Sequence, residues 1–291
     1  MKKGITIRAF SSNPSFLAAA DFLGSVDDFK RCFAQAAAAG FEGIQPYLQQ
    51  KGFFSLQTEG GVLKKIASAA KEAGLEISSV EIEPLSYSLT DDDPNVRQQG
   101  RHTILRAMEA ACEMGAPAVL VIPGYVGLPW DPGIIPIRYD HAYDRTREGL
   151  AELVVSAEKL CVSMLVENIW NKFLLSPLEV RTLIDEIGSR HVGAFLDVGN
   201  IMLFGYPEQW IRILGPRIGE IHLKDFRQDV GTIHGFVTLL DGDVNWSQVA
   251  LALREINYQG FLTAEMTPFK HCGDAIIAQT SLAMDKIMGR V

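Results

Sequence analysis

Short apolar segments alternate with longer segments of helical periodicity along this chain. The first pair is a branched apolar run over residues 4–9 and an amphipathic pattern over residues 25–40 that ends at a glycine. Ser25 is a favourable N-cap for that helix, and Asp27 and Asp28 lie in its first turn, where the helix dipole stabilises negative charge. We therefore predict a strand followed by a helix.

The same alternation continues to the C-terminus. Further strands are predicted over residues 41–48, 75–82, 118–123, 163–168, 192–200, 218–225 and 260–266. Helices are predicted near residues 62–74, 95–115, 139–160 and 274–288, and two more begin after Pro207 and Asn245. Strands that are mostly apolar and alternate with helices are typical of a parallel sheet covered on both faces.

Eight strand-helix units fit the length of the chain, because a barrel of this kind needs about 250 residues. We predict an α/β fold in which residues 1–291 form a single (β/α)8 TIM barrel domain. The segment over residues 10–24 is predicted to be a long loop at the ligand-binding end of the barrel.

Four of the predicted strands end at side chains that can bind a divalent metal ion, namely Glu167, Asp197, His222 and Glu265. They are 30, 25 and 43 residues apart in sequence (167 to 197, 197 to 222 and 222 to 265), which is about one strand-helix-strand unit each. A local loop cannot bring them together, but the carboxyl ends of parallel barrel strands converge on one point. A single carboxylate at a strand end is more often a helix cap or an ion-pair partner, whereas four such positions favour a metal site.

This ligand set combines carboxylate oxygens with one imidazole and contains no thiolate. Such a set suits Mn²⁺, Mg²⁺ or Co²⁺ and argues against a structural zinc site. We expect Mn²⁺, with Mg²⁺ and Co²⁺ as alternatives.

Composition narrows the class of partner. The formal net charge is −8, and no cluster of Lys or Arg is dense enough to neutralise a phosphate backbone, so we expect no nucleic-acid partner. No apolar run is long enough to span a bilayer, and we expect no membrane association. The 4 cysteines lack C-x-x-C spacing and are predicted to be mostly buried free thiols, which together with the absence of a signal peptide favours a cytoplasmic location.

Segments of the second half of the chain resemble a known family. Residues 166–177, 196–200, 221–225 and 240–246 resemble signature segments of the sugar phosphate isomerase/epimerase family. This family belongs to the xylose isomerase-like barrels and includes D-tagatose 3-epimerase and L-xylulose-5-phosphate 3-epimerase. The resemblance implies a small-molecule sugar or sugar phosphate as substrate and a homodimer or homotetramer as the assembly.

The resemblance also implies that Glu167, Asp197, His222 and Glu265 bind the metal and that the two glutamates form the acid/base pair. The chemistry agrees, because moving a proton on the carbon beside a ketone passes through an enediolate whose charge a divalent cation stabilises. Epimerisation returns the proton to the opposite face of that carbon, so a carboxyl group is needed on each side.

Four polar residues near the predicted strand ends are candidates for substrate binding. Asn200 occupies a position where free-sugar epimerases of the family have histidine, which favours a phosphorylated or otherwise modified sugar unless Asn200 only caps a turn. Arg227 could bind a phosphate or hydroxyl groups, or form a surface ion pair instead. Lys224 could contact substrate or pair with Asp225, and Gln45 could make a polar contact where relatives often have glutamate.

Aromatic side chains in predicted loops and strand ends could stack on a sugar ring. These are Trp130, Trp170, Phe10 and Phe173, although aromatic residues more often belong to the core.

Three functions remain open at this level. The first is a metal-dependent epimerase or aldose-ketose isomerase of a ketose or its phosphate. The second is a lyase, dehydratase or C-glycoside-cleaving subunit that acts on a sugar or inositol derivative through the same enediolate chemistry. The third is a non-catalytic sugar-binding barrel, which the intact ligand set disfavours. A nucleic-acid phosphodiesterase is disfavoured by the acidic charge and the single convincing histidine ligand.

Overall fold

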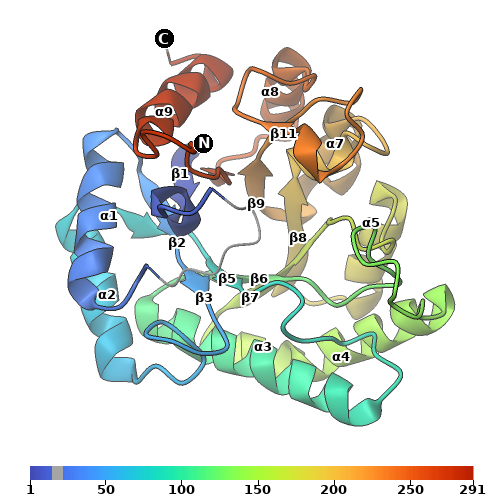
Figure 1. The fold of residues 1–291 in the computed structure, drawn as a ribbon. Coiled ribbons are helices and arrows are strands. Elements are labelled where there is room, and N and C mark those ends of the chain that lie inside the picture. The colour runs from blue at the N-terminus through green and yellow to red at the C-terminus, as the bar shows by residue number, and fades with distance from the viewer. Residues whose placement is uncertain (15–21, 291) are drawn as a thin grey trace.

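Parallel strands form the centre of the molecule and helices surround them (Figure 1). The computed structural model describes residues 1–14 and 22–290. Residues 15–21, which belong to the predicted loop over residues 10–24, lie outside the described residues.

The barrel strands pair in parallel, in the order of the chain. They are β1 (Lys2–Thr6), β2 (Gly43–Gln45), β3 (Tyr47–Leu48), β4 (Glu76–Ile77), β5 (Val80–Ile82), β6 (Ala118–Val121), β7 (Ser163–Glu167), β8 (Val192–Asp197), β9 (Ile218–Leu223) and β12 (Phe261–Ala264). The sheet order runs from β3 through β5, β6, β7, β8, β9, β12, β1 and β2 to β4.

This order closes into a barrel. Pro46 separates β2 from β3 and two serines separate β4 from β5, so each pair is one interrupted barrel strand. β2 pairs with β4 and β3 pairs with β5, which joins the two ends of the sheet. The predicted (β/α)8 fold class is confirmed, with eight barrel strands at the predicted places.

The helices of the outer layer lie between successive barrel strands. They are α1 (Val26–Ala38), α2 (Gly60–Glu72), α3 (Pro94–Met114), α4 (Tyr139–Leu160), α5 (Pro177–Ile187), α7 (Pro207–Leu214), α8 (Trp246–Glu255) and α9 (Ala275–Met288). The backbone N–H of Asp28 donates to Ser25 Oγ at 3.3 Å, so the predicted N-cap of α1 is present.

Shorter elements lie at the carboxyl ends of the strands. A 3-10 turn η1 (Ile7–Phe10) follows β1, and the short helix α6 (Val198–Ile201) follows β8 at once, where the sequence predicts a longer strand. After β9, the antiparallel strands β10 (Asp225–Phe226) and β11 (Phe236–Val237) form a hairpin.

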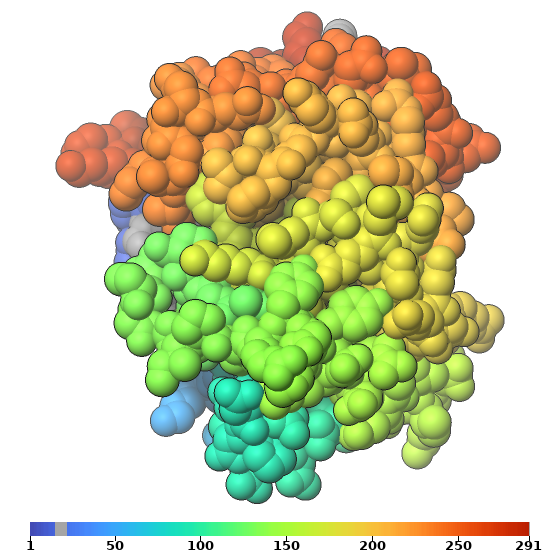
Figure 2. All heavy atoms as spheres, turned by 90° about the vertical axis from the view of Figure 1, so that its right-hand side faces the viewer, coloured from blue at the N-terminus to red at the C-terminus, as the bar shows by residue number. Residues whose placement is uncertain are grey.

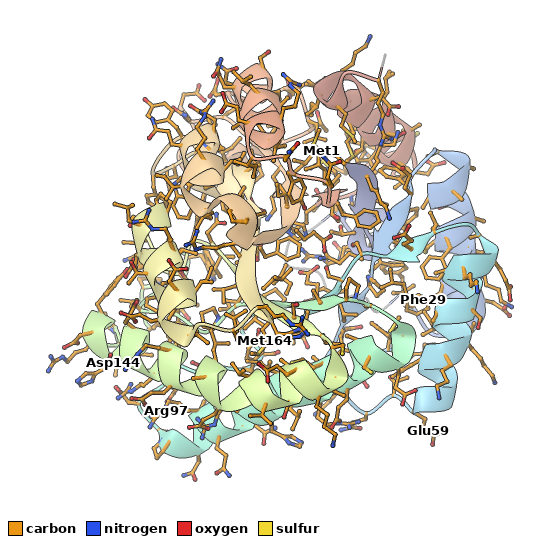
Figure 3. All side chains as sticks on the ribbon, turned by 180° about the vertical axis from the view of Figure 1, so that it is seen from behind. Met1, Phe29, Glu59, Arg97, Asp144 and Met164 are labelled. Carbon is orange, nitrogen blue, oxygen red and sulfur yellow. The ribbon has the colours of Figure 1, made fainter. Side chains whose placement is uncertain are left out.

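Side chains alternate along the barrel strands between the barrel interior and the helices, apart from a register shift in the β8–β9 pairing between Ala194 and Phe195. Met164 and Val166 of β7 belong to the large apolar core between strands and helices, whereas Leu165 lies in a separate cluster inside the barrel with Phe195. Seen from behind, Met164 lies at the barrel wall, while Arg97 and Asp144 lie on the outer helices (Figure 3). The apolar core therefore fills the layer between the strands and the helices.

The outer surface is continuous on the side that carries α5 and α7. Figure 2 shows segments coloured from green through yellow to orange packed against one another over this face.

The cysteines are buried only in part, whereas most of them were predicted to be buried. Cys32 is buried as predicted, but Cys112, Cys161 and Cys272 are exposed, because they lie on outward helix and loop positions.

Among the described residues, no helix combines the length and the apolar character that a membrane crossing requires.

Candidate metal centre

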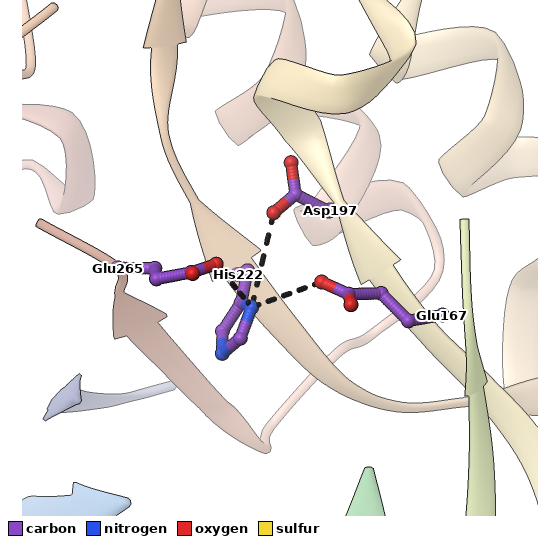
Figure 4. A group of neighbouring side chains, drawn as sticks. All are labelled: Glu167, Asp197, His222 and Glu265. Atoms are coloured by element: carbon purple, nitrogen blue, oxygen red, sulfur yellow. Dashed lines mark hydrogen bonds and ion pairs between the residues drawn. The ribbon is translucent and has the colours of Figure 1, made fainter. Parts of the chain in front are cut away.

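The four predicted metal ligands meet at one point inside the carboxyl end of the barrel. Glu167 and Asp197 end β7 and β8, His222 lies near the end of β9, and Glu265 directly follows β12. One ligand atom from each lies within 4.8 Å of the corresponding atoms of the other three, and all four side chains are buried. His222 Nδ1 lies 3.1 Å from Glu167 Oε1, 3.1 Å from Glu265 Oε2 and 3.8 Å from Asp197 Oδ2 (Figure 4).

Neighbouring groups fix the orientation of two of these ligands. His222 Nε2 lies 2.8 Å from Gln45 Oε1, which turns the other ring nitrogen toward the three carboxylates. Asp197 is the N-cap of α6, and its Oδ1 accepts the backbone N–H of Asn200 at 2.7 Å. The second oxygen of Asp197 therefore points into the cluster.

The cluster fits a divalent cation. Asp197 Oδ2 is buried and has no hydrogen-bond donor among the described residues, although the Lys224 ammonium lies 3.0 Å away as an ion-pair partner. Three carboxylates and one imidazole converge within 4.8 Å, which is the mixed oxygen and nitrogen set that Mn²⁺, Mg²⁺ or Co²⁺ can accept. Without a cation, three buried carboxylates this close would repel one another strongly.

Two basic side chains also reach the cluster. Lys224 Nζ lies 2.6 Å from Glu265 Oε2 and 3.0 Å from Asp197 Oδ2. Arg8 forms ion pairs with Glu265 and, at 3.4 Å, with Glu81 Oε1. Both oxygens of Glu265 are therefore held by cations.

These contacts govern the ionisation of the cluster. Burial raises the pKa of Glu265, but attraction to Lys224 and Arg8 outweighs burial and holds the pKa well below its usual range. Burial raises the pKa of Asp197 to about 6, although Lys224 opposes the change. Burial lowers the pKa of His222, but the charges of Glu265 and Glu167 raise it to about 10.

A close approach of the backbone positions Lys224. The short helix α6 lies against β9 at Gly199, where a Cβ atom would lie 2.6 Å from the Cβ of Lys224. Only glycine allows this contact, so the turn after β8 fixes the lysine that pairs with the last residue of β8.

A cavity of about 180 Å³ opens above the cluster. It is lined by Arg8, Tyr47, Glu81, Glu83, Pro84, Leu85, Ile122, Trp130, Glu167, Ile169, Trp170, Asn200, Lys224, Ile233, Phe236 and Glu265. The two glutamates of the cluster face this cavity, whereas Asp197 and His222 lie beneath it.

Several predicted substrate-binding residues lie at this cavity. Lys224, Asn200, Trp130 and Trp170 are all part of its wall. The side-chain amide of Asn200 donates to the carbonyl of Asn168 at 2.9 Å, and its role toward a substrate stays a prediction. The turn is capped by Asp197, the last residue of β8, and not by Asn200.

Three other predicted contact residues lie outside the cavity wall. Arg227 is half exposed and pairs with Asp241 at 2.8 Å on the surface, because the β10–β11 hairpin directs it away from the cavity. Phe173 is buried in the core against Tyr139, with ring centroids 5.5 Å apart. Phe10 packs on the core outside the cavity wall.

Gln45 and Asp225 have other partners than the sequence analysis predicted. Gln45 is fully buried below the cavity and contacts His222 instead of a substrate. Asp225 does not pair with Lys224. It accepts the backbone N–H groups of Phe226 and Leu240 and the indole N–H of Trp246, each at 2.9 Å. Asp225 therefore anchors the loop that carries the hairpin.

Sequence reasoning missed Arg8, Glu81, Glu83 and Tyr47, although each lines the cavity. The sequence signal that could have identified Glu81 is the alternation of inward and outward side chains along a strand. Val80 and Ile82 of β5 pack in the apolar core outside the barrel, so the period of two places Glu81 between them inside the barrel.

The comparisons with known proteins agree with this architecture. The sequence profile of the xylose isomerase-like TIM barrel family matches residues 33–284. D-psicose 3-epimerase of Enterocloster bolteae is 26% identical over 267 residues, which cover 89% of this chain and 83% of that enzyme. A crystal structure of a D-psicose 3-epimerase in the presence of D-fructose superposes with a TM-score of 0.78 at 20% identity, over 99% of this chain and 100% of that one.

Two other relatives are a dehydratase and an epimerase by name. Inosose dehydratase of Bacillus thuringiensis is 23% identical over 266 residues, covering 84% of this chain and 83% of that enzyme. The 2-epi-5-epi-valiolone 7-phosphate 2-epimerase of an Actinoplanes species is 28% identical over 198 residues, covering 67% of each.

Proposed function

The chain belongs to the xylose isomerase-like TIM barrel family, and on this premise we propose that it is a divalent-metal-dependent epimerase or isomerase of a ketose or related sugar. The single observation that carries the proposal is the buried group of Glu167, Asp197, His222 and Glu265 at the floor of the cavity. The likeness to D-psicose 3-epimerase supports the reaction type.

In this proposal the two glutamates transfer the proton on two sides of the ligand. Glu167 and Glu265 approach His222 from opposite sides (Figure 4), and both line the cavity. Lys224 and Arg8 keep Glu265 ionised, so it can accept a proton from carbon, and Glu167 can exchange a proton at the other face. A divalent cation held by the cluster would polarise the ketone and stabilise the negative charge that develops beside it.

The cavity wall would orient a sugar and keep water out. Trp170 and Phe236 have ring centroids 5.1 Å apart and form an apolar wall, and Lys224 Nζ lies 5.4 Å from the centroid of the Phe236 ring. Apolar faces of this kind can pack on the C–H surface of a sugar, while the charged residues meet its hydroxyl groups.

The experiment that tests the proposal is hydrogen exchange in D2O. Free and phosphorylated ketoses are incubated with the Mn²⁺-loaded protein, and deuterium at carbon is measured by NMR. We expect exchange at the carbon beside the ketone, and loss of that exchange in Glu265→Gln. Glu220→Gln is the matched control, since Glu220 is also buried inside the barrel but lies outside the cavity wall. Full exchange in Glu265→Gln would remove this residue from the mechanism.

A lyase reaction is the second candidate, supported by the likeness to inosose dehydratase. Such an enzyme would use the same glutamates to remove a proton and would then expel water from the substrate. Mass spectrometry of the product separates the two reactions, because epimerisation leaves the mass unchanged and dehydration lowers it.

Assembly and location belong to the same proposal. We expect a homodimer or homotetramer in the cytoplasm, with Mn²⁺ as the bound metal. Light scattering after gel filtration measures the assembly, and elemental analysis of protein purified without added metal identifies the ion.

A further inference from the structure

Glu81 is a buried carboxylate at the cavity wall with one unsatisfied oxygen. It lies in β5, opposite Tyr47 of β3 and Leu120 of β6, and only 3% of its surface is exposed. Its Oε1 lies 3.4 Å from Arg8 Nη2, but its Oε2 is buried and has no hydrogen-bond partner among the described residues. Leaving a buried carboxylate oxygen unpaired is costly, so this atom requires an explanation.

A second buried glutamate shows that carboxylates in the barrel interior do not generally lack hydrogen-bond partners. Glu220 of β9 is equally buried, but Thr263 Oγ1 donates to its Oε1 at 2.5 Å, and it lies outside the cavity wall. The interior glutamate away from the cavity has a protein partner for its carboxylate. The one that lines the cavity, Glu81, has a carboxylate oxygen without such a partner among the described residues.

Arg8 fixes the position of Glu81 relative to the metal cluster. Its guanidinium pairs with both Glu81 and Glu265 and lies 5.0 Å from the centroid of the Tyr47 ring. The two carboxylates are therefore held by one rigid, planar group. A ligand whose reacting carbon lies beside Glu265 would bring a neighbouring hydroxyl within reach of Glu81.

The charges of the wall favour an uncharged ligand. The cavity is lined by four carboxylates, Glu81, Glu83, Glu167 and Glu265, and by the cations Arg8 and Lys224. Both cations are paired with carboxylates, and residues 15–21, which lie outside the described residues, contain no Lys or Arg. A divalent cation would only balance the remaining negative charge, so a phosphate group would meet no spare positive charge on this wall.

We propose that Glu81 is a substrate-binding residue that accepts a hydrogen bond from a hydroxyl group of an uncharged polyhydroxy ketone, a ketose or a ketocyclitol. The inference rests on the proposed function for the position of the ketone at the metal cluster. It departs from the prediction, based on Asn200, that a phosphorylated sugar is favoured. Glu81 would thereby contribute to specificity without taking part in proton transfer.

Binding of D-fructose to the Mn²⁺-loaded protein tests the proposal. Trp130 and Trp170 line the cavity, so tryptophan fluorescence measures dissociation constants without turnover. We expect Glu81→Ala to weaken D-fructose binding about tenfold to hundredfold, as for a lost hydrogen bond to a charged group. Glu81→Gln keeps the size of the side chain and is expected to weaken binding less, and Glu220→Gln should bind within twofold of wild type.

A series of monodeoxy fructoses identifies the hydroxyl group. One of them should bind the wild-type protein as weakly as D-fructose binds Glu81→Ala, and should lose no further affinity in that variant. Equal losses in Glu81→Ala for D-fructose and for every deoxy analogue would overturn the direct contact. So would D-fructose binding to both Glu81 variants within twofold of wild type.

D-fructose 6-phosphate tests the class of substrate. We expect it to bind the wild-type protein more weakly than D-fructose. Tighter binding of the phosphate, lost in Lys270→Gln, would overturn the uncharged class, because Lys270 lines a neighbouring cavity that shares Lys224 and Glu265 with this one. Binding of no sugar and no exchange in D2O would refute the proposed function as well, whereas exchange with unchanged affinity in the Glu81 variants would refute only the role of Glu81.

Discussion

The interior of the barrel and the layer between strands and helices are built from alternate residues of the same strands, yet their chemistry differs sharply at the carboxyl ends of β8 and β9. In β8, Leu196 packs into the apolar outer layer, and the adjacent Asp197 points into the metal cluster. In β9, Ile221 and His222 divide in the same way. One step along a strand therefore separates a residue that stabilises the fold from one that performs chemistry.

The interior is itself divided. Ala118, Leu120, Ile122, Leu165 and Phe195 form an apolar cluster inside one side of the barrel, and the ring of Phe195 lies 4.4 Å from that of His222. The charged Glu167 and Asp197 end β7 and β8, the same strands that supply Leu165 and Phe195 of this apolar cluster. Buried charge is tolerated in the interior because it is paired or hydrogen-bonded, while apolar packing elsewhere supplies the stability.

The largest expected effect on stability comes from the outer layer. Leu196→Ala removes a fully buried side chain and should lower the free energy of unfolding by about 2–5 kcal/mol. Chemical denaturation of the metal-free protein measures this change. Mn²⁺ affinity should stay within a few fold of wild type in the folded variant, and a large loss of affinity would show that the two regions are not independent.

The adjacent residue is expected to behave in the opposite way. Asp197→Asn keeps the Oδ1 acceptor that caps α6 but removes the charge on the metal side, so Mn²⁺ should bind more than about 100-fold more weakly. Calorimetric titration with Mn²⁺ measures the affinity. Stability of the metal-free protein should change much less than in Leu196→Ala, and a comparable loss would contradict the division between interior and outer layer.

Removal of the metal also distinguishes the outer layer from the metal cluster. Mn²⁺ at 100 times its dissociation constant should stabilise the folded protein by about 2.7 kcal/mol, and chelation should reverse this gain. Thermal unfolding with and without Mn²⁺ measures the difference. The Leu196→Ala variant should show the same gain as wild type, whereas Asp197→Asn should show almost none at the same metal concentration.

The smallest expected effect concerns the residue behind the histidine. Gln45→Leu removes the acceptor at His222 Nε2 and should weaken Mn²⁺ binding about 10–100-fold. The affinity is measured by the same titration. Gln35→Leu, an exposed change on α1, is the control and should leave the affinity unchanged. Unchanged affinity in Gln45→Leu would show that the ring of His222 is positioned by its other contacts.

Local patterns predicted the fold and the position of the cluster well. The mostly apolar strands β7 and β8 end at Glu167 and Asp197, as predicted, and the helix α4 was predicted over residues 139–160, as observed. The four residues of the cluster lie at strand ends, where the topology of a parallel barrel brings them together whatever the details of packing. Their roles as metal ligands and as an acid/base pair stay predictions.

Contacts that depend on side-chain direction could not be predicted in the same way. Arg227 faces Asp241 because the β10–β11 hairpin turns it outward, and that hairpin was not foreseen. Phe173 is in a loop by sequence, but packing against Tyr139 buries it. An aromatic residue in a loop can face a cavity or a core, and the local sequence does not distinguish the two.

The sequence by itself determined the barrel, because strand and helix periodicity is local, and it determined which strand ends carry metal-binding side chains. Only the tertiary structure decided how the charges are paired. Arg8 meets Glu265 across 257 residues of chain, and it meets Glu81 on the third barrel strand, only when the ring of strands closes. The physical reason is that ion pairs and unsatisfied oxygens depend on distances of a few ångströms between strands, which closure of the barrel alone fixes.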